Sequence, residues 1–291
     1  MEAVSSVPVD RTGTPNVRLS LSNRAENVAL VRQMLAGVAE AVGLGEHDLN
    51  DITTAATEAC NNVVLHAYQG AEGPLQIEIF SEPESLEVVV CDQGAGIPAR
   101  VRAPDEAAGI GLSVIQALAQ RVEFRRPPDG GTEVRMEFAT PAARTLERCS
   151  EDELELAPIV EAELASTMQI TIAPAPLART VLPRMLSMFA ARAHFSTDRI
   201  ADLQLVADAL VAHVPGSISG SHLSVAIHVQ PRDIELRIAP LRAGCAGQLI
   251  LDSALAGLAP VIDRLTDHQR VAAVGAPADA EMLALRLIDR R

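Results

Sequence analysis

The sequence predicts an α+β protein: a two-layer α/β sandwich in which helices cover one face of a mixed, mostly antiparallel sheet, tandemly duplicated along the chain. Two observations predict this fold. Strand and helix periodicities alternate in a set order along residues 16–140, and the same order returns along residues 166–291. The chain has 291 residues, 48% of them apolar, which is enough to form two separate cores.

The first copy begins with a strand followed by two amphipathic helices. VRLSL at 17–21 alternates apolar and polar residues, as a half-buried strand does. Apolar residues then recur at helical spacing over 25–42 and 47–68. The remaining elements are expected as strands at 75–80 and 86–91, a helix at 110–121, and strands at 122–126 and 133–138 around a turn at 127–131.

The second copy repeats these patterns about 150 residues later, a spacing typical of a duplicated domain rather than a solenoid. MQITI at 168–172 corresponds to VRLSL. The other expected elements are helices at 182–193 and 202–210, and strands at 223–229 and 234–238. Residues 141–165 are expected to form an acidic linker, and residues 1–15 a flexible tail.

Composition excludes several classes of function. The net charge of −14 disfavours direct binding to nucleic acid, because a negative surface repels phosphates. The four cysteines lack metal-ligand spacing and are expected to be reduced core thiols. No signal peptide and no apolar run long enough to cross a membrane is evident, so we expect a cytoplasmic protein.

Three polar residues share one stripe of the second expected helix. Glu58, Asn62 and His66 are spaced four apart, so they lie on the same helix face. An amide oxygen suits magnesium, and a carboxylate one turn away could deprotonate a nucleophile at a γ-phosphate. A solvated polar helix face is the alternative explanation.

Glycine motifs follow at three places. Asp92, with Gly94 and Gly96, ends a buried strand, and a carboxylate there could accept a hydrogen bond from an exocyclic amine. Gly109 and Gly111 open a helix, whose N-terminus suits phosphate. An ordinary turn and a flexible helix start would also explain these two motifs. The GGT motif at 130–132 is explained by a hairpin turn alone.

The order of these motifs resembles the nucleotide-binding domain shared by DNA gyrase, sensor histidine kinases and mismatch-repair ATPases. EACNNVVLHAY at 58–68 and the short segment 97–108 are most similar to the bacterial anti-sigma factors that are also serine-protein kinases. The resemblance covers residues 16–140. It implies binding of ATP and Mg²⁺, a sigma factor and an anti-sigma factor antagonist as partners, and phosphorylation of a Ser or Thr on the antagonist.

The resemblance also implies a role for each motif residue. Glu58 is implied as the general base and Asn62 as the magnesium ligand, whereas packing is expected for His66. The residues implied in binding the nucleotide are Asp92, Gly94, Gly96 and Thr132 at adenine, and Gly109 and Gly111 at the phosphates. Arg100 or Arg102 could reach the γ-phosphate, and nothing in their spacing chooses between them.

The second copy is expected to be a degenerate one without a ligand. Ala209 and His213 stand where the first copy has Glu58 and Asn62, and Pro240 stands in place of Asp92. The glycines at 109 and 111 become Leu255 and Gly257, and the GGT turn has no clear counterpart.

Four functions remain open from the sequence. The first is an ATP-binding anti-sigma factor with kinase activity, and the second is an ATP-dependent protein-binding switch without it. A sensor-kinase ATPase domain is disfavoured, since no hairpin with a phospho-acceptor His precedes residue 16. A stress-response scaffold is the fourth. Because kinases of the resembled family act as homodimers, the second copy is expected to form a pseudo-dimer with the first.

Overall fold

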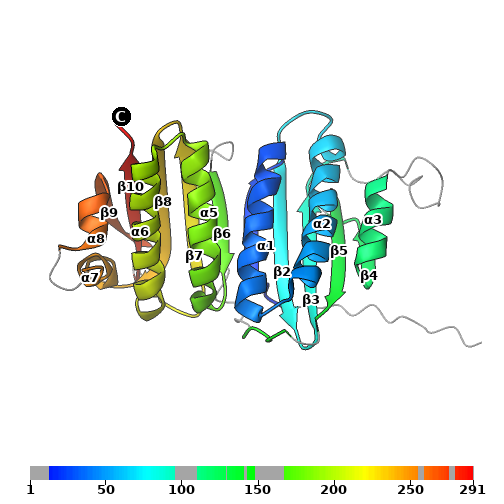
Figure 1. Cartoon of the computed structure of the whole chain (residues 1–291), viewed down its shortest axis with the longest axis horizontal. Coiled ribbons are helices and arrows are strands. Elements are labelled where there is room, and N and C mark those ends of the chain that lie inside the picture. The colour runs from blue at the N-terminus through cyan, green and yellow to red at the C-terminus, as the bar shows by residue number, and fades with distance from the viewer. Residues whose placement is uncertain are drawn as a thin grey trace, which may run out of the picture.

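A computed structural model describes residues 13–95, 110–128, 130–140, 143–147, 167–254, 259–274 and 279–290. The chain forms a two-layer α+β structure, in which the helices lie on one face of a ten-stranded sheet (Figure 1). The strand order is β4-β5-β3-β2-β1-β6-β7-β8-β10-β9. The two-layer arrangement is confirmed.

The expectation of a mixed sheet is wrong for the described residues, because every strand pairing among them is antiparallel. The chain reverses direction three times between β1 and β2, before, between and after the two helices, so these strands run in opposite directions. A single helix separates β3 from β4, which therefore run parallel. However, β5 lies between them in the sheet, so they are not hydrogen-bonded to each other.

The described residues of the first half form five strands and three α-helices. Its elements are β1 (Val17–Ser22), η1 (Ala25–Asn27), α1 (Val28–Val42), α2 (Glu46–Asn62), η2 (Val63–Ala67), β2 (Pro74–Glu82), β3 (Ser85–Asp92), α3 (Ile110–Leu118), β4 (Arg121–Arg125) and β5 (Thr132–Ala139). The helix expected at 47–68 ends as η2, a π-helical turn. Such turns widen a helix by one residue and occur frequently at functional sites.

The second half has the same strand order outward from the centre of the sheet. Its elements are β6 (Thr167–Ile172), η4 (Ala175–Leu177), α5 (Ala178–Arg192), α6 (Thr197–His213), η5 (Val214–Gly216), β7 (Leu223–Gln230), β8 (Asp233–Arg242), α7 (Cys245–Asp252), α8 (Val261–Leu265), β9 (His268–Val274) and β10 (Ala280–Ile288). The sequence had predicted no element beyond residue 238. Of the four that lie wholly beyond it, α8 has only five residues, whereas β10 carries an alternation of buried Leu283, Leu285 and Leu287 that sequence reasoning missed.

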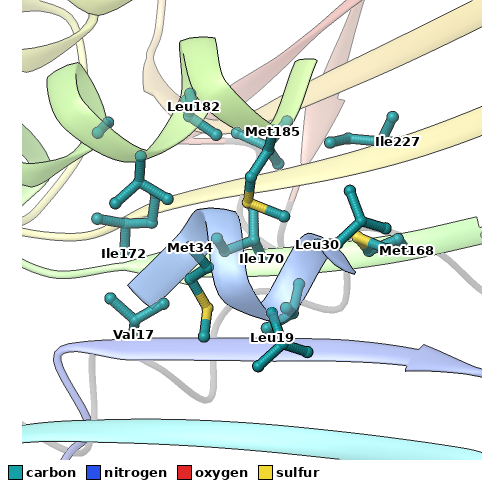
Figure 2. Close-up of a cluster of buried hydrophobic side chains, with 14 of the residues drawn as sticks. Val17, Leu19, Leu30, Met34, Met168, Ile170, Ile172, Leu182, Met185 and Ile227 are labelled. Atoms are coloured by element: carbon teal, nitrogen blue, oxygen red, sulfur yellow. The ribbon is translucent and has the colours of Figure 1, made fainter. Parts of the chain in front are cut away.

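The two halves meet in the middle of the sheet. β1 pairs with β6, and α1 packs against α5 directly in front of them (Figure 1). Figure 2 shows the core at this junction, where Met34 and Met185 come from the two helices and Leu19 and Ile170 from the two strands. All four side chains are fully buried. One hydrophobic core therefore runs across the junction.

Gly37 sets the distance between α1 and α5. A side chain at Gly37 would begin 2.6 Å from the carbonyl oxygen of Thr180 and 2.8 Å from the Cα of Val181. These are backbone atoms of a helix, which cannot move aside as a flexible side chain can. Only glycine permits the two helices to pack this closely.

Residues just after β5 remain attached to the first half. Arg144 donates from its backbone N–H to the carbonyl oxygen of Val42, at 2.8 Å, and from its guanidinium to that of Ala41, at 2.6 Å. These contacts cap the C-terminus of α1, whose last carbonyl groups lack partners within the helix. Thr14, in the expected tail, is also buried. Ordered structure thus extends slightly beyond residues 16–140 at both ends.

Candidate functional site

Helix α2 brings the first group of predicted site residues together with the start of α3. Figure 1 shows α3 beside α2 at the edge of the first half. A side chain at Gly111 would begin 2.7 Å from Oε2 of Glu58 and 3.8 Å from Oδ1 of Asn62. The carboxylate and the amide oxygen therefore face the same point, the first turn of α3, as their spacing on one helix face predicted.

The second group surrounds Asp92 at the end of β3. Asp92 is only 6% exposed. Its Oδ1 accepts a hydrogen bond from the N–H of Gly94 at 2.8 Å, and its carboxylate also accepts from the N–H and hydroxyl of Thr132. Burial raises the pKa of Asp92 above its ordinary value, although these hydrogen bonds act in the opposite direction. A buried carboxylate at the end of a strand, with its pKa raised by burial, is a candidate for a binding site.

Two glycines let the backbone close around Asp92. A side chain at Gly131 would begin 1.8 Å from the carbonyl oxygen of Asp92, and Gly131 has a φ of +79°. A side chain at Gly94 would begin 2.1 Å from the carbonyl oxygen of Ala67. The hairpin explanation of the GGT motif was therefore incomplete, because Gly131 is also required for its contact with Asp92.

The π-helical turn η2 connects the two groups. Its last residue, Ala67, accepts a hydrogen bond from the N–H of Ala95 in the loop after Asp92, at 2.9 Å. Since η2 continues directly from α2, the element that carries Glu58 and Asn62 also holds the Asp92 loop in place. Sequence reasoning missed Ala67, whose contribution is a backbone carbonyl that no side-chain pattern reports.

Some predicted residues lie elsewhere or outside the described part of the chain. Gly96, Gly109, Arg100 and Arg102 fall outside the described residues. The packing role expected for His66 is wrong, because this side chain is exposed on η2. The widened π turn changes the direction of residues that an unbroken α-helix would have kept on the stripe of Glu58 and Asn62.

The cysteines were expected to be buried, reduced thiols, and among the described ones only Cys60 lies fully in the core. Cys60, Cys91 and Cys245 are free, and Cys149 lies outside the described residues. Cys60 is buried, whereas the other two are partly buried. Burial raises the pKa of Cys60 and of Cys91 to about 12. Both thiols are therefore protonated at neutral pH, the form that is a poor nucleophile.

The strand registers show which residues occupy the same positions in the second half. Asp92 is paired with Leu75, and the pair Ser224–Ala239 places Pro240 at the corresponding step of the second ladder. The helices α2 and α6 are both 17 residues long. Aligning them residue by residue places Ala209 at the position of Glu58 and His213 at that of Asn62. These positions agree with the sequence comparison.

Counting along the chain from the matched core positions Val134 and Leu283 places Glu281 two residues back, as Thr132 is. A register shift between Glu281 and Leu283 pairs Glu281 with Leu241, so the two positions match in the chain but not in strand register. The Glu281 carboxylate accepts hydrogen bonds from the N–H groups of Gly244, at 2.9 Å, and Ala246, at 3.1 Å. In the second half this position therefore binds the chain's own backbone at the start of α7.

Comparison with known proteins bears directly on the first half. Residues 21–138 match the family model described as histidine kinase-like ATPase domain. An anti-sigma F factor of Thermoanaerobacter sp. (strain X514) is 28% identical over 132 residues, which cover 42% of this chain and 92% of that protein. The serine-protein kinase RsbW of Bacillus mycoides (strain KBAB4) is 30% identical over 121 residues, which cover 37% of this chain and 76% of the relative. The chain belongs to the anti-sigma factor and serine-protein kinase family of histidine kinase-like ATPases.

The family domain accounts for the half that contains Asp92, Glu58 and Asn62. It is therefore an ATP-binding type of domain, and the remaining half of the chain lies outside the matched residues. Within the described residues, no helix has the length and apolarity needed to cross a bilayer. That part of the chain also contains no group of three His, Cys, Asp or Glu side chains that could hold a metal ion.

Proposed function

We propose that this chain is an ATP-binding anti-sigma regulatory factor that also acts as a serine/threonine-protein kinase towards an antagonist protein in a partner-switching pathway. The observation that carries the proposal is the convergence of Glu58 and Asn62 on Gly111, while the same helix holds the Asp92 loop. Two relatives supply the partner classes, since one is named an anti-sigma F factor and the other a serine-protein kinase.

The residues at the first group fit a magnesium–nucleotide complex. Oδ1 of Asn62 is a neutral oxygen of the kind magnesium accepts, and ATP phosphates supply further oxygen ligands. A site that shares its metal with phosphates does not need a cage of three protein ligands. Magnesium bound there would neutralise charge on the phosphates.

Each site residue then has a separate task. Asp92 would accept a hydrogen bond from the exocyclic amine of adenine, and Gly94 and Thr132 hold its carboxylate in place for this. Glu58 would accept the proton of the attacking Ser or Thr hydroxyl at one of its carboxylate oxygens. The absence of a side chain at Gly111 lets the first turn of α3, whose N–H groups suit phosphate, lie directly against the Glu58 carboxylate.

Replacing Glu58 with Gln tests the kinase assignment. We expect Glu58→Gln to bind ATP–Mg²⁺ with nearly the wild-type Kd, because binding does not require a proton acceptor. Transfer of γ-phosphate to a purified antagonist encoded in the same genome should fall about a hundredfold or more. Calorimetry measures the binding and radiolabelled ATP the transfer, and Glu46→Gln on the exposed start of α2 is the control. Unchanged transfer in Glu58→Gln would show that Glu58 is not the base.

An ATP-dependent binding switch without kinase activity is the second candidate. The close approach of Gly111 to the Glu58 carboxylate favours it, because a hydroxyl can reach Oε2 only after α3 shifts. This candidate predicts no phosphate transfer in the wild type, together with ATP-dependent binding of a partner. The wild-type arm of the Glu58 experiment separates the two candidates.

We also infer that residues 166–291 are a degenerate copy of the domain at 16–140, joined to it by the linker at 141–165, and that the two copies form an internal pseudo-dimer. The pairing of β1 with β6, the packing of α1 on α5 and the matching strand orders support this. The second half would then occupy the place of a second subunit. The chain should therefore sediment as a monomer, and a tight homodimer formed through the first half would contradict the inference.

A further inference from the structure

Tyr68, the chain's one tyrosine, connects three segments beside the Asp92 loop. It follows η2 directly. Its hydroxyl donates a hydrogen bond to the carbonyl oxygen of Pro74 at 2.5 Å and accepts one from the N–H of Gln93 at 2.8 Å. Pro74 is the first residue of β2, and Gln93 is the residue after Asp92. A single hydroxyl therefore joins the end of a helix, the start of a strand and the candidate adenine-binding loop.

The ring of Tyr68 is held in place by Gly73. A side chain at Gly73 would begin 2.1 Å from Cε1 of the ring and 2.4 Å from Cδ1 and Cζ. The aromatic ring thus packs directly against the Cα of Gly73, where any larger residue would displace it. Gly73 therefore prevents the ring from shifting towards it, and the hydrogen bonds with Pro74 and Gln93 hold the hydroxyl.

Each of the three described backbone amides after Asp92 is bonded to an acceptor. The N–H of Gly94 binds the Asp92 carboxylate, and the N–H of Ala95 binds the carbonyl oxygen of Ala67. The N–H of Gln93 is the remaining amide of this turn, and Tyr68 holds it. The orientation of the Asp92 side chain depends on the path of this turn, so the Tyr68 hydroxyl contributes to orienting the Asp92 carboxylate.

We propose that Tyr68 is a positioning residue that aims the Asp92 carboxylate at the nucleotide base and thereby sets the preference for adenine over guanine. The inference rests on the proposed ATP site. Adenine presents an amine donor where guanine presents a carbonyl acceptor, so the discrimination depends on where the carboxylate points. A tyrosine that only filled space would affect folding without affecting this discrimination.

Burial, with a smaller contribution from the charge of Asp92, raises the pKa of Tyr68 above its ordinary value. The phenol therefore stays neutral throughout the range in which nucleotide binding is measured, and it retains the proton that it donates to Pro74. Tyr68→Phe removes this hydroxyl and leaves the ring against Gly73.

The experiment compares ATP–Mg²⁺ and GTP–Mg²⁺ binding to the wild type, Tyr68→Phe and Asp92→Asn by calorimetry. We expect Tyr68→Phe to raise the Kd for ATP about three- to tenfold, the usual range for one lost hydrogen bond. The Kd for GTP should change much less, so the ratio of the Kd for GTP to the Kd for ATP should decrease. The thermal midpoint should change little, since Gln93 is exposed and water can replace the lost acceptor.

The outcomes separate this proposal from the proposed site. If Asp92→Asn loses ATP binding while Tyr68→Phe keeps both the wild-type Kd and the wild-type ATP/GTP ratio, the positioning role is wrong and the site stands. If Asp92→Asn binds ATP as the wild type does, the site itself is wrong. The wild type adds an independent signal: with one tyrosine and no tryptophan, its tyrosine fluorescence comes from Tyr68 alone and should respond to ATP.

A second variant keeps the proposal testable if Tyr68→Phe folds poorly. Gly73→Ala retains the hydroxyl but pushes the ring away, so it should also narrow the ATP/GTP ratio. Gly45→Ala is the matched control, because a side chain there would begin 3.8 Å from its nearest neighbour, the Asp48 carboxylate. The positioning role would be overturned if the ratio of the Kd for GTP to the Kd for ATP were the same in Gly73→Ala, Gly45→Ala and the wild type.

Discussion

Replacing Asp92 with Asn should remove most of the ATP affinity while leaving the nucleotide-free protein at least as stable as the wild type. The amide cannot offer the negatively charged acceptor that binds the adenine amine. A hydrogen bond to a charged group contributes about 1.5–3 kcal/mol, which corresponds to a rise in Kd of about ten- to a hundredfold. Calorimetric titration with ATP–Mg²⁺ measures this loss.

The stability part of this prediction follows from the pKa of Asp92. Burial raises this pKa in the folded state, so the ionised carboxylate destabilises the folded protein at neutral pH. This penalty shrinks as the pH falls below the raised pKa of the folded state, and it is gone below the ordinary pKa of the unfolded state, where both states hold the proton. Asn carries no charge at any pH. The stability advantage of Asp92→Asn should therefore be present at neutral pH and vanish in acid.

Thermal unfolding of the wild type and Asp92→Asn from neutral to acidic pH measures whether the stability difference has the predicted sign. The affinity of the wild type for ATP should fall over the same acidic interval, as Asp92 loses the charge that binds the amine. An Asp92→Asn protein that is less stable than the wild type at neutral pH would show that the carboxylate has a structural role instead. Undiminished ATP binding by Asp92→Asn would contradict the site assignment.

Replacing Gly37 with Ala should destabilise the whole chain, although Ala is the better helix former. In an exposed helix this substitution stabilises by about 1 kcal/mol. At Gly37 the added carbon would lie 2.6 Å from a backbone oxygen of α5, so α1 and α5 must separate. Overpacking of this kind costs about 1–3 kcal/mol and can exceed the gain in helix propensity. Urea unfolding followed by circular dichroism measures the net loss.

Gly247 provides a matched control for this substitution. It also lies within a helix, α7, but a side chain there would meet nothing within 4 Å. Gly247→Ala should therefore stabilise the chain or leave it unchanged, the opposite sign from Gly37→Ala. If Gly37→Ala were as stable as Gly247→Ala, the close contact between the two halves would not exist in solution.

Much of the fold could be predicted from local sequence patterns. The strand at 17–21 and the helix at 25–42 appear close to their predicted bounds, because their apolar periodicity is strong and their ends carry clear signals. Elements with weaker patterns, such as α7 and β9, were missed. The sequence could not show that β5 lies between β3 and β4 in the sheet. Strand order is a property of the assembled sheet, and the order of elements along the chain does not determine it.

The residues of the candidate site likewise fall into those that the sequence predicted and those that it did not. Glu58, Asn62 and Asp92 were predicted because their chemistry is carried by side chains at recognisable spacings. Ala67, Gly131 and Tyr68 were given no such role, because their contributions are a backbone carbonyl, a close approach and a hydroxyl bonded to a distant amide. Contacts of this kind depend on segments that meet only after folding.

The sequence by itself determined the family, the element types of the first half and the side chains that carry charge at the candidate site. The tertiary structure alone decided that two halves share one ten-stranded sheet and one core, that Glu281 binds the backbone at the start of α7, and that η2 joins the two parts of the site. The reason is physical. Periodicity and side-chain chemistry are local properties of the chain, whereas strand register and the close approach of backbones arise from packing between segments that are far apart in sequence.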